Sequence, residues 1–437
     1  MTNTPHRIVI VGGGSGGLKL ATWLGDRYRD DATVEITLID GTLTHVWKPL
    51  LHEIAAGTLD VHDDEREYMA HGRAHHFRFT WGRMEGLDRS ARQVWLEPLR
   101  EDSGNDALPR RAVPYDTLVI AVGSVSNDFG VPGVAEHCYT LDSVAEAERF
   151  RRQLLEAYLR AEQRAGALDP GELDVAVVGA GATGVELAAE LDRMRRQLTA
   201  YGVRKLDPER DSRLVLVEQA PRVLPGLADD LAAATRAQLE RLGVELHTGE
   251  AVSQARADGL RLSSDTFIPA RFLVWAAGVK APAFLQQIDG LETDRGNRLM
   301  VGSTLQTTRD ERIFALGDCA ACPPKPGSER TVPPRAQAAD QQAAFLARSL
   351  ACRRAGKPLP RFEYHDRGAL VNVHDSAFGT LMGSLLGQVT IKGWFARLGY
   401  RSLYRAHQRA LHGSLRAALL WLTDILTRRT RPRLKLH

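Results

Sequence analysis

The stretch RIVIVGGGSGGLKLATWL, residues 7–24, decides the fold of this chain. The apolar run Arg7–Val11 predicts a buried strand, a glycine-rich turn follows it, and Leu18–Leu24 has the spacing of a helix. In such a unit Gly12 allows the tight turn, Gly14 lets backbone approach a pyrophosphate, and Gly17 lets the helix pack on the strand. A glycine-rich helix start that binds nothing is the alternative explanation of one isolated copy.

A second copy of the pattern lies in the middle of the chain. Val175–Val178 predicts the strand and Val185–Leu191 the helix, and the turn between them carries the equivalent glycines Gly179, Gly181 and Gly184. Each copy is followed by a strand that ends in an acid, Asp40 in the first and Glu218 in the second. A carboxylate at this position binds a ribose diol. Two copies with both features favour two dinucleotide sites over the alternative.

Three later segments also predict strands, and each strand is followed by a glycine or an acid at its end. Thr117–Val122 leads into Gly123, Phe272–Ala277 leads into Gly278, and residues 312–316 lead to Asp318. The polar or proline-marked stretches 101–114 and 323–334 predict loops.

Length and composition describe an ordinary globular chain. With 437 residues, about three domains of roughly 150 residues are expected, and 43% hydrophobic with 25% charged residues excludes fibrous and disordered classes. Four cysteines cannot form a disulfide framework, so a reducing compartment is expected. No apolar run reaches the roughly 18 residues of a membrane span, and the first strand begins too early to leave room for a signal peptide.

The charge is unevenly distributed. Residues 392–437 hold eleven Lys or Arg and one acid, Asp424, a net charge of +10; since the whole chain has +3, the remaining residues have −7. Residues 394–411 and 415–426 predict two amphipathic helices, which favours attachment to an anionic phospholipid surface. The alternative is a helical pair packed on the body or on a second subunit, as in a homodimer. No nucleic-acid-binding motif accompanies the charge.

Together these segments resemble the two-dinucleotide-binding-domain flavoproteins, and within them the type II, non-proton-pumping NADH:quinone oxidoreductases. The resemblance covers essentially the whole chain. It rests on the two glycine-rich turns, the basic tail and the segments HVWKPLLHEIAAGTLD (45–60), YDTLVIAVGS (115–124), VWAAGVKAP (274–282), FALGDCA (314–320) and VPPRAQAADQQ (332–342). It implies an α/β fold of two Rossmann-like domains, disulfide-reductase-like, with a C-terminal amphipathic membrane-anchoring segment.

The resemblance implies that the first unit binds FAD and the second binds NADH. The FAD contacts would be Gly12, Gly14, Gly17, Asp40, Gly123 and Asp318, with Asp318 on the ribitol chain or, alternatively, capping the following turn. The NADH contacts would be Gly179, Gly181, Gly184, Glu218 and Gly278. Glu218 would repel a 2′-phosphate and so favours NADH, although the nearby Arg222 leaves NADPH open.

The same resemblance places further residues near the flavin and the quinone. Glu186 would order the nicotinamide or relay protons to the quinone, or it only complements the helix dipole. Ala336 and Gln337 open a helix whose amides would face the flavin, and Gln337 and Gln341 would contact the quinone, unless they only decorate a surface helix. Lys48 would lie near the flavin or is a solvated loop lysine.

The cysteines and histidines do not predict a metal site. Cys319 and Cys322 have a CxxC spacing, but no second Cys/His pair has finger-like spacing, so we expect them to be structural rather than zinc-binding or redox-active. The fourteen histidines form no recognisable ligand cluster.

The expected domains are 1–145 for the first part of the FAD domain, 146–301 for the NADH domain, 302–385 for the returning FAD part with the quinone-side segment, and 386–437 for the membrane segment. The expected activity is hydride transfer from NADH to FAD, then two electrons to a membrane quinone (ubiquinone or menaquinone), at the cytoplasmic face of the inner membrane. A sulfide:quinone oxidoreductase, which needs cysteines beside the flavin, and a non-catalytic NADH-sensing membrane flavoprotein are the alternatives; a soluble disulfide reductase would lack its Cys pair.

Overall fold

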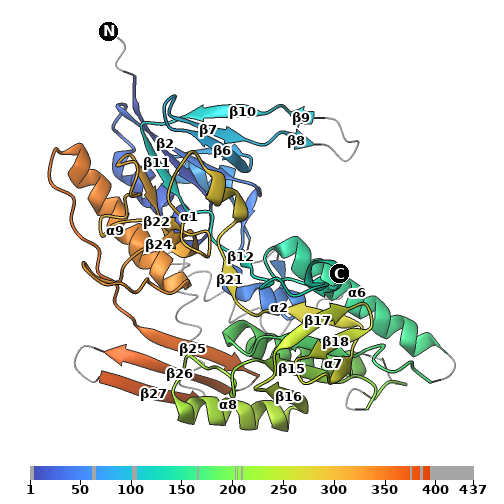
Figure 1. Cartoon of the computed structure of the whole chain (residues 1–437). Helices are drawn as coiled ribbons and strands as arrows, with labels where there is room; N and C mark the ends of the chain where they lie inside the picture. Colours follow the sequence, from blue (N-terminus) through green and yellow to red (C-terminus); the bar gives the residue numbers. More distant parts are fainter. Residues whose placement is uncertain are drawn as a thin grey trace. The chain divides into compact units, whose positions relative to one another are not determined.

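The computed structural model describes residues 4–61, 65–100, 106–164, 167–201, 203, 205–207, 210–374, 376–383 and 387–393. Its contacts divide the chain into two units, each assembled from three stretches (Figure 1). The first unit comprises 1–47, 64–125 and 279–365, and the second comprises 48–63, 126–278 and the described residues from 366 onward. The expected boundaries after 145 and 301 differ from these, and the expected cofactor of each domain stays a prediction. The two amphipathic helices predicted for residues 394–411 and 415–426 lie outside the described residues.

The first unit is built on a parallel five-stranded sheet. Its strand order is β23 (Ile313–Ala315), β11 (Thr117–Ile120), β1 (His6–Val11), β2 (Val34–Asp40) and β5 (Arg78–Trp81). The central strands are continuous apolar runs because both faces of the sheet are covered. Helix α1 (Ser15–Tyr28) follows β1 through the glycine-rich turn and packs against α9 (Ala336–Arg354). The expected strand–turn–helix unit is therefore confirmed, with a longer helix.

An antiparallel sheet extends the first unit, and it corrects one expectation. Strands β6 (Met84–Asp88), β7 (Gln93–Leu96) and β10 (Arg111–Pro114) form this sheet. The prediction that 101–114 is a loop was wrong for its second half, because β9 (Asp106–Leu108) and β10 lie there. Arg111–Pro114 pairs residue by residue with β7, and this long-range pairing outweighs a polar, proline-ending sequence. The first unit also contains several short elements, namely α4 (Tyr68–Ala74), β3 (Thr44–His45), β4 (Arg66–Glu67), β8 (Leu99–Arg100), β22 (Leu299–Met300), β24 (Ala320–Ala321), η2 (Ala283–Gln287) and η3 (Gly317–Cys319).

The second unit repeats this plan. Its parallel sheet has the order β13 (Cys138–Tyr139), β20 (Phe272–Trp275), β14 (Val175–Val178), β15 (Leu214–Glu218) and β16 (Val244–Thr248). An antiparallel sheet follows, formed by β17 (Val252–Arg256), β18 (Gly259–Leu262) and β19 (Phe267–Pro269). Helix α7 (Ala182–Ala200) corresponds to α1. The internal duplication seen in the sequence is thus confirmed and extends to the antiparallel sheets.

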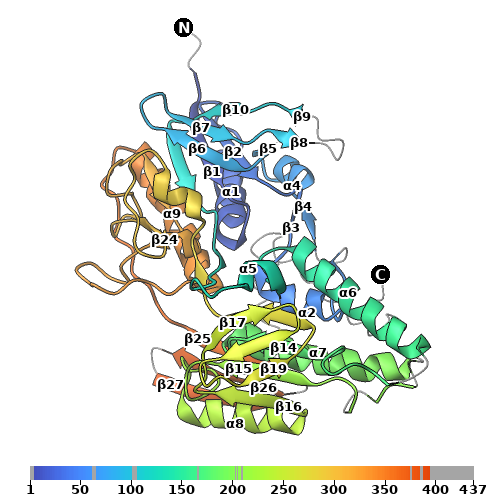
Figure 2. The same cartoon turned by 45° about the vertical axis from the view of Figure 1, so that its right-hand side comes forward.

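Helices and a third sheet complete the second unit. The helices are α2 (Leu51–Ala55) after the turn η1 (Lys48–Leu50), α5 (Val134–His137), α6 (Val144–Gln163) and α8 (Asp229–Arg241). Strands β25 (Gly368–Val373), β26 (Ser376–Gly383) and β27 (Gly387–Gly393) form an antiparallel sheet that contacts α7 and α8; both views show α8 beside it (Figure 2). Short strands β12 (Val125–Ser126) and β21 (Val279–Lys280) lie where the chain passes between the units. Among the described residues, no helix has the length and apolarity needed to cross a membrane.

Candidate active site

The two glycine-rich turns have the same geometry. Gly12 has φ +103° and Gly179 has φ +101°, a region that favours glycine. A Cβ on Gly17 would lie 1.9 Å from the carbonyl oxygen of Gly12, and a Cβ on Gly184 would lie 1.9 Å from that of Gly179. Glycine is therefore required at both positions for the helix to approach the strand.

The middle glycine of each turn faces open space. A Cβ on Gly14 or on Gly181 would meet no atom within 4 Å. Each of these glycines is the N-cap of its helix, and neither helix has a side-chain cap or an acid in its first turn. The first backbone N–H groups and the positive end of the helix dipole are therefore available to an anion. Both turns fit a dinucleotide pyrophosphate.

The strand-end acids bind their own turns in the same way. Oδ2 of Asp40 accepts the N–H of Gly13 at 2.6 Å, and Oε2 of Glu218 accepts the N–H of Ala180 at 2.7 Å. The second oxygen of Asp40 accepts from Thr42, and that of Glu218 accepts the N–H of Ala220 at 2.9 Å. These bonds fix each carboxylate beside its turn, where a ribose diol would lie.

In the first unit, two side chains that the sequence did not single out hold the turn from the other side. Tyr68 donates its hydroxyl to the carbonyl oxygen of Gly13 at 2.9 Å, and Nδ1 of His45 contacts the same oxygen at 2.9 Å. Burial lowers the pKa of His45 to about 4, so its ring is neutral at pH 7. His45 lies in the segment quoted for the family resemblance, but nothing in its periodicity signals this contact.

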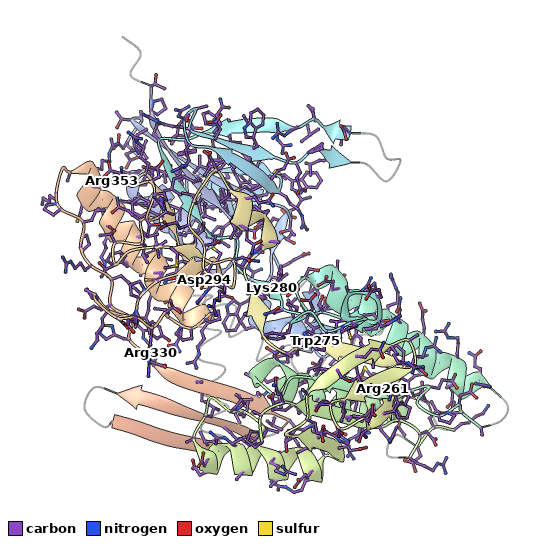
Figure 3. The ribbon with its side chains drawn as sticks, in the orientation of Figure 1. Arg261, Trp275, Lys280, Asp294, Arg330 and Arg353 are labelled. Atoms are coloured by element: carbon purple, nitrogen blue, oxygen red, sulfur yellow. The ribbon has the colours of Figure 1, made fainter. Side chains whose placement is uncertain are left out.

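Asp318 and Gly123 lie together at the ends of neighbouring strands. Asp318 is in η3, directly after Gly317 with φ +75°, and accepts the hydroxyl of Ser124 at 2.8 Å. Gly123 has φ +70° and Gly278 has φ +86°, which confirms the expected glycine turns after β11 and β20. In the second unit, Trp275 at the end of β20 donates its ring N–H to the carbonyl oxygen of Asn127 at 2.7 Å (Figure 3).

Glu186 is buried in a cluster of polar groups. The sequence pattern places Glu186 in the first turn of its helix, but α7 begins at Ala182 and Glu186 therefore lies beyond that turn, where it complements the helix dipole less than expected. The side chain is only 8% exposed; Oε1 accepts the backbone N–H of Asn372 at 3.0 Å, and Oε2 lies 3.8 Å from Nδ1 of His52. Sequence analysis missed His52 and Asn372, since only folding brings α2, α7 and β25 together.

The remaining candidates hold contacts of their own. Lys48 is half exposed and forms a 3.4 Å ion pair with Asp142. Helix α9 begins at Ala336 as expected and has no side-chain cap. Gln341 uses both ends of its amide on the backbone of His365, donating to its oxygen at 2.8 Å and accepting its N–H at 3.0 Å. Arg222 binds Asp229 and the carbonyl oxygens of Pro225 and Leu227 within its own loop.

The cysteines are poor nucleophiles in this structure. Burial raises the pKa of Cys138, Cys319 and Cys322 to about 12, so these free thiols stay protonated at pH 7. In the described part of the chain, no three His, Cys, Asp or Glu side chains are grouped to hold a metal ion.

The duplicated Rossmann-like plan with two glycine-rich turns defines the class of proteins with two dinucleotide-binding domains. Residues 6–343 match the family model described as pyridine nucleotide-disulphide oxidoreductase, which confirms the expected fold. A type II NADH:quinone oxidoreductase of Haemophilus influenzae is 42% identical over 98% of this chain and 99% of its own length. The chain belongs to the family of type II NADH:quinone oxidoreductases.

Two solved structures have the same fold. NDH2 of Plasmodium falciparum, solved in complex with NADH, has a TM-score of 0.82 at 17% identity and covers 98% of this chain and 100% of its own. The sulfide:quinone oxidoreductase of Aquifex aeolicus has a TM-score of 0.70 at 18% identity, covering 94% and 92%. At 17% and 18% identity, the structural similarity establishes the fold alone. The family assignment rests on the Haemophilus influenzae relative, which is 42% identical.

Proposed function

We propose that the protein oxidises NADH and delivers the two electrons through FAD to a membrane quinone, ubiquinone or menaquinone, without pumping protons. One observation carries the proposal: both glycine-rich turns are open at their middle glycine and held by a strand-end carboxylate. The near full-length similarity to a type II NADH:quinone oxidoreductase supports it.

The cofactor supplies the redox chemistry and the chain supplies binding and electrostatics. FAD, when bound, accepts a hydride from a nicotinamide and gives up two electrons to an acceptor. The N-terminus of α1 and Asp40 would hold its pyrophosphate and adenosine ribose, and Asp318 its ribitol chain. The amides of Ala336 and Gln337 at the start of α9 would stabilise negative charge near the flavin ring.

In the second unit, the N-terminus of α7 and Glu218 would hold NADH. Gly278, with its left-handed backbone, would let the nicotinamide half approach closely. The Glu218 carboxylate accepts two backbone N–H groups, which hold it beside the turn, where a carboxylate would disfavour a 2′-phosphate. Glu186 would order the nicotinamide or transfer protons to the quinone. Lys48, Gln337 and Gln341 stay predicted flavin or quinone contacts; Gln341 has its side-chain amide committed to His365.

The test is anaerobic absorbance of the flavin in the purified protein. NADH should bleach the flavin band and a short-chain quinone should restore it. Bleaching by sulfide but not NADH would favour the sulfide enzyme, which the protonated thiols of Cys138, Cys319 and Cys322 disfavour. Tight NADH binding with no bleaching by either reductant would favour the sensor.

We propose that the protein is a peripheral protein of the inner membrane, on its cytoplasmic face, bound through the basic segment after Gly393. Each base near an anionic leaflet contributes about 1 kcal/mol, and apolar side chains supply the rest. Removing residues 394–437 should abolish sedimentation with vesicles rich in anionic phospholipid while the flavin stays bound. A truncated protein that still sediments would show that the anchor lies elsewhere. Gel filtration of both forms would test the homodimer.

A further inference from the structure

Phe129 combines two unfavourable features that packing does not offset. Its φ of +51° lies in the left-handed region, which is strained for a bulky side chain, and the residue is 64% exposed. Leu224 and Leu305 also have positive φ, but they are 3% and 0% exposed, so burial in the core offsets their strain. Strained residues cluster at ligand sites and active sites. The conformation and exposure of Phe129 therefore point to a function for its ring.

Hydrogen bonds to the end of β20 hold the strained turn in place. The side-chain oxygen of Asn127 accepts the backbone N–H of Phe129 at 3.1 Å. The backbone N–H of Asn127 donates to the carbonyl oxygen of Gly278 at 3.1 Å, and its carbonyl oxygen accepts the ring N–H of Trp275 at 2.7 Å. A strained conformation persists only where such surrounding contacts enforce it. The fold thus fixes Phe129 at the carboxyl end of β20.

The ring of Phe129 lies against the same short segment as the glycine-rich turn. A Cβ on Gly278 would lie 2.9 Å from Cζ of Phe129, so glycine leaves the room that the ring needs. A Cβ on Gly179 would lie 2.7 Å from the carbonyl oxygen of Ala276 and 2.7 Å from Cα of Ala277. The pyrophosphate turn and the Phe129 ring therefore both contact residues 276–278.

The strand order determines which half of a dinucleotide reaches Phe129. Strand β14 lies between β15 and β20 in the sheet. Glu218 ends β15, so an adenosine ribose bound by Glu218 lies on that side of the glycine-rich turn. A dinucleotide crosses the carboxyl ends of the strands at such a point, and its other half extends over the end of β20. That end carries Gly278 and, against it, the exposed ring of Phe129.

We propose that Phe129 binds the nicotinamide ring of the dinucleotide through its aromatic face. The proposal rests on the proposed function, since it requires a nicotinamide dinucleotide at the second glycine-rich turn. An aromatic ring offers a stacking surface to the planar nicotinamide, and it attracts the delocalised positive charge that this ring has in NAD⁺. The adenosine half has no such charge and lies on the opposite side of the turn. The contact thus selects and orders the nicotinamide end.

The test compares two ligands that differ only by the nicotinamide ring. Full-length protein loaded with FAD is titrated calorimetrically with NAD⁺ and with ADP-ribose, which keeps the adenosine, the pyrophosphate and the second ribose. In Phe129→Ala the affinity for NAD⁺ should decrease about five- to thirtyfold, while that for ADP-ribose stays within about twofold of the wild type. Unchanged affinity for NAD⁺, or an equal loss for both ligands, would overturn the proposal.

Two control variants separate the aromatic contact from general damage. Phe267→Ala removes another exposed phenylalanine of the same unit, on β19, and should leave both affinities unchanged. Phe129→Leu keeps an apolar side chain without the aromatic ring, and its affinity for NAD⁺ should decrease as in Phe129→Ala. A leucine variant that binds NAD⁺ as tightly as the wild type would overturn the aromatic contact.

Phe129→Gly keeps the test decisive if the alanine variant does not fold. Glycine adopts positive φ without strain, so the urea midpoint of unfolding should be no lower than that of the wild type, while NAD⁺ affinity decreases. A lower midpoint would assign Phe129 a role in packing and overturn the proposal. Wild-type protein that binds neither NAD⁺ nor ADP-ribose would reject the proposed function itself. Binding of both ligands to the wild type and, equally tightly, to Phe129→Gly would reject this inference alone.

Discussion

Substituting Gly184 tests whether the second glycine-rich turn binds a dinucleotide. An alanine Cβ would lie 1.9 Å from the carbonyl oxygen of Gly179, whereas ordinary carbon–oxygen contacts begin above 3.0 Å. The start of α7 must therefore move away from β14 by about 1 Å or more. Overpacking of this kind costs roughly 1–3 kcal/mol. When this strain displaces the turn that binds the ligand, the same free energy is lost from binding. At 1.4 kcal/mol per factor of ten, the affinity for the dinucleotide then decreases about 5- to 150-fold.

The assay is calorimetric titration with NAD⁺, which binds without turnover, on protein with its full complement of FAD. Gly181→Ala is the matched variant, since its Cβ meets nothing within 4 Å and its φ of −71° suits alanine. Its stability should fall by no more than about 1 kcal/mol, the loss of a glycine N-cap, while NAD⁺ binding weakens through contact with the pyrophosphate. Wild-type NAD⁺ affinity in both variants would refute the placement of the dinucleotide at this turn.

Three further predictions follow from buried charges and the strand-end acid. Asp192→Ala should lower the free energy of unfolding by about 3–5 kcal/mol in urea, because Asp192 is fully buried and pairs at 2.9 Å with the buried Arg195; a loss below 1 kcal/mol would contradict this. Glu218→Ala should reduce the preference in kcat/KM for NADH over NADPH about tenfold or more, and an unchanged ratio would argue against Glu218 at the ribose. The free energy of unfolding should decrease as the pH falls from 6.5 to 4, because His45 and His52 bind protons in the unfolded state but, with their pKa lowered to about 4, stay neutral in the folded state. The decrease should reach up to about 3 kcal/mol for each ring. In urea titrations at several pH values, His52→Gln should remove about half of this pH dependence, and an unchanged pH dependence would contradict the prediction.

Local sequence determined the parts of this protein that depend on a few neighbouring residues. The two strand–turn–helix units follow from glycine at positions where the backbone has positive φ or where a Cβ would meet a carbonyl oxygen, as at Gly12 and Gly184. The strand-end positions of Asp40 and Glu218 follow from the apolar runs before them. The resemblance to the type II NADH:quinone oxidoreductases also came from local sequence, because it rests on these short segments taken together.

Only the tertiary structure decided which side chains meet across the chain. Strand β10 forms because β7 supplies its hydrogen bonds, against the loop that its composition predicts. His52, Glu186 and Asn372 come from three distant segments, and none has a sequence pattern that signals burial or partnership. A charged or polar side chain is found in the interior only where folding supplies a partner, and the partner's identity depends on long-range packing rather than on local periodicity. The sequence therefore determined the two glycine-rich turns and their strand-end acids, and the fold determined which buried groups surround Glu186.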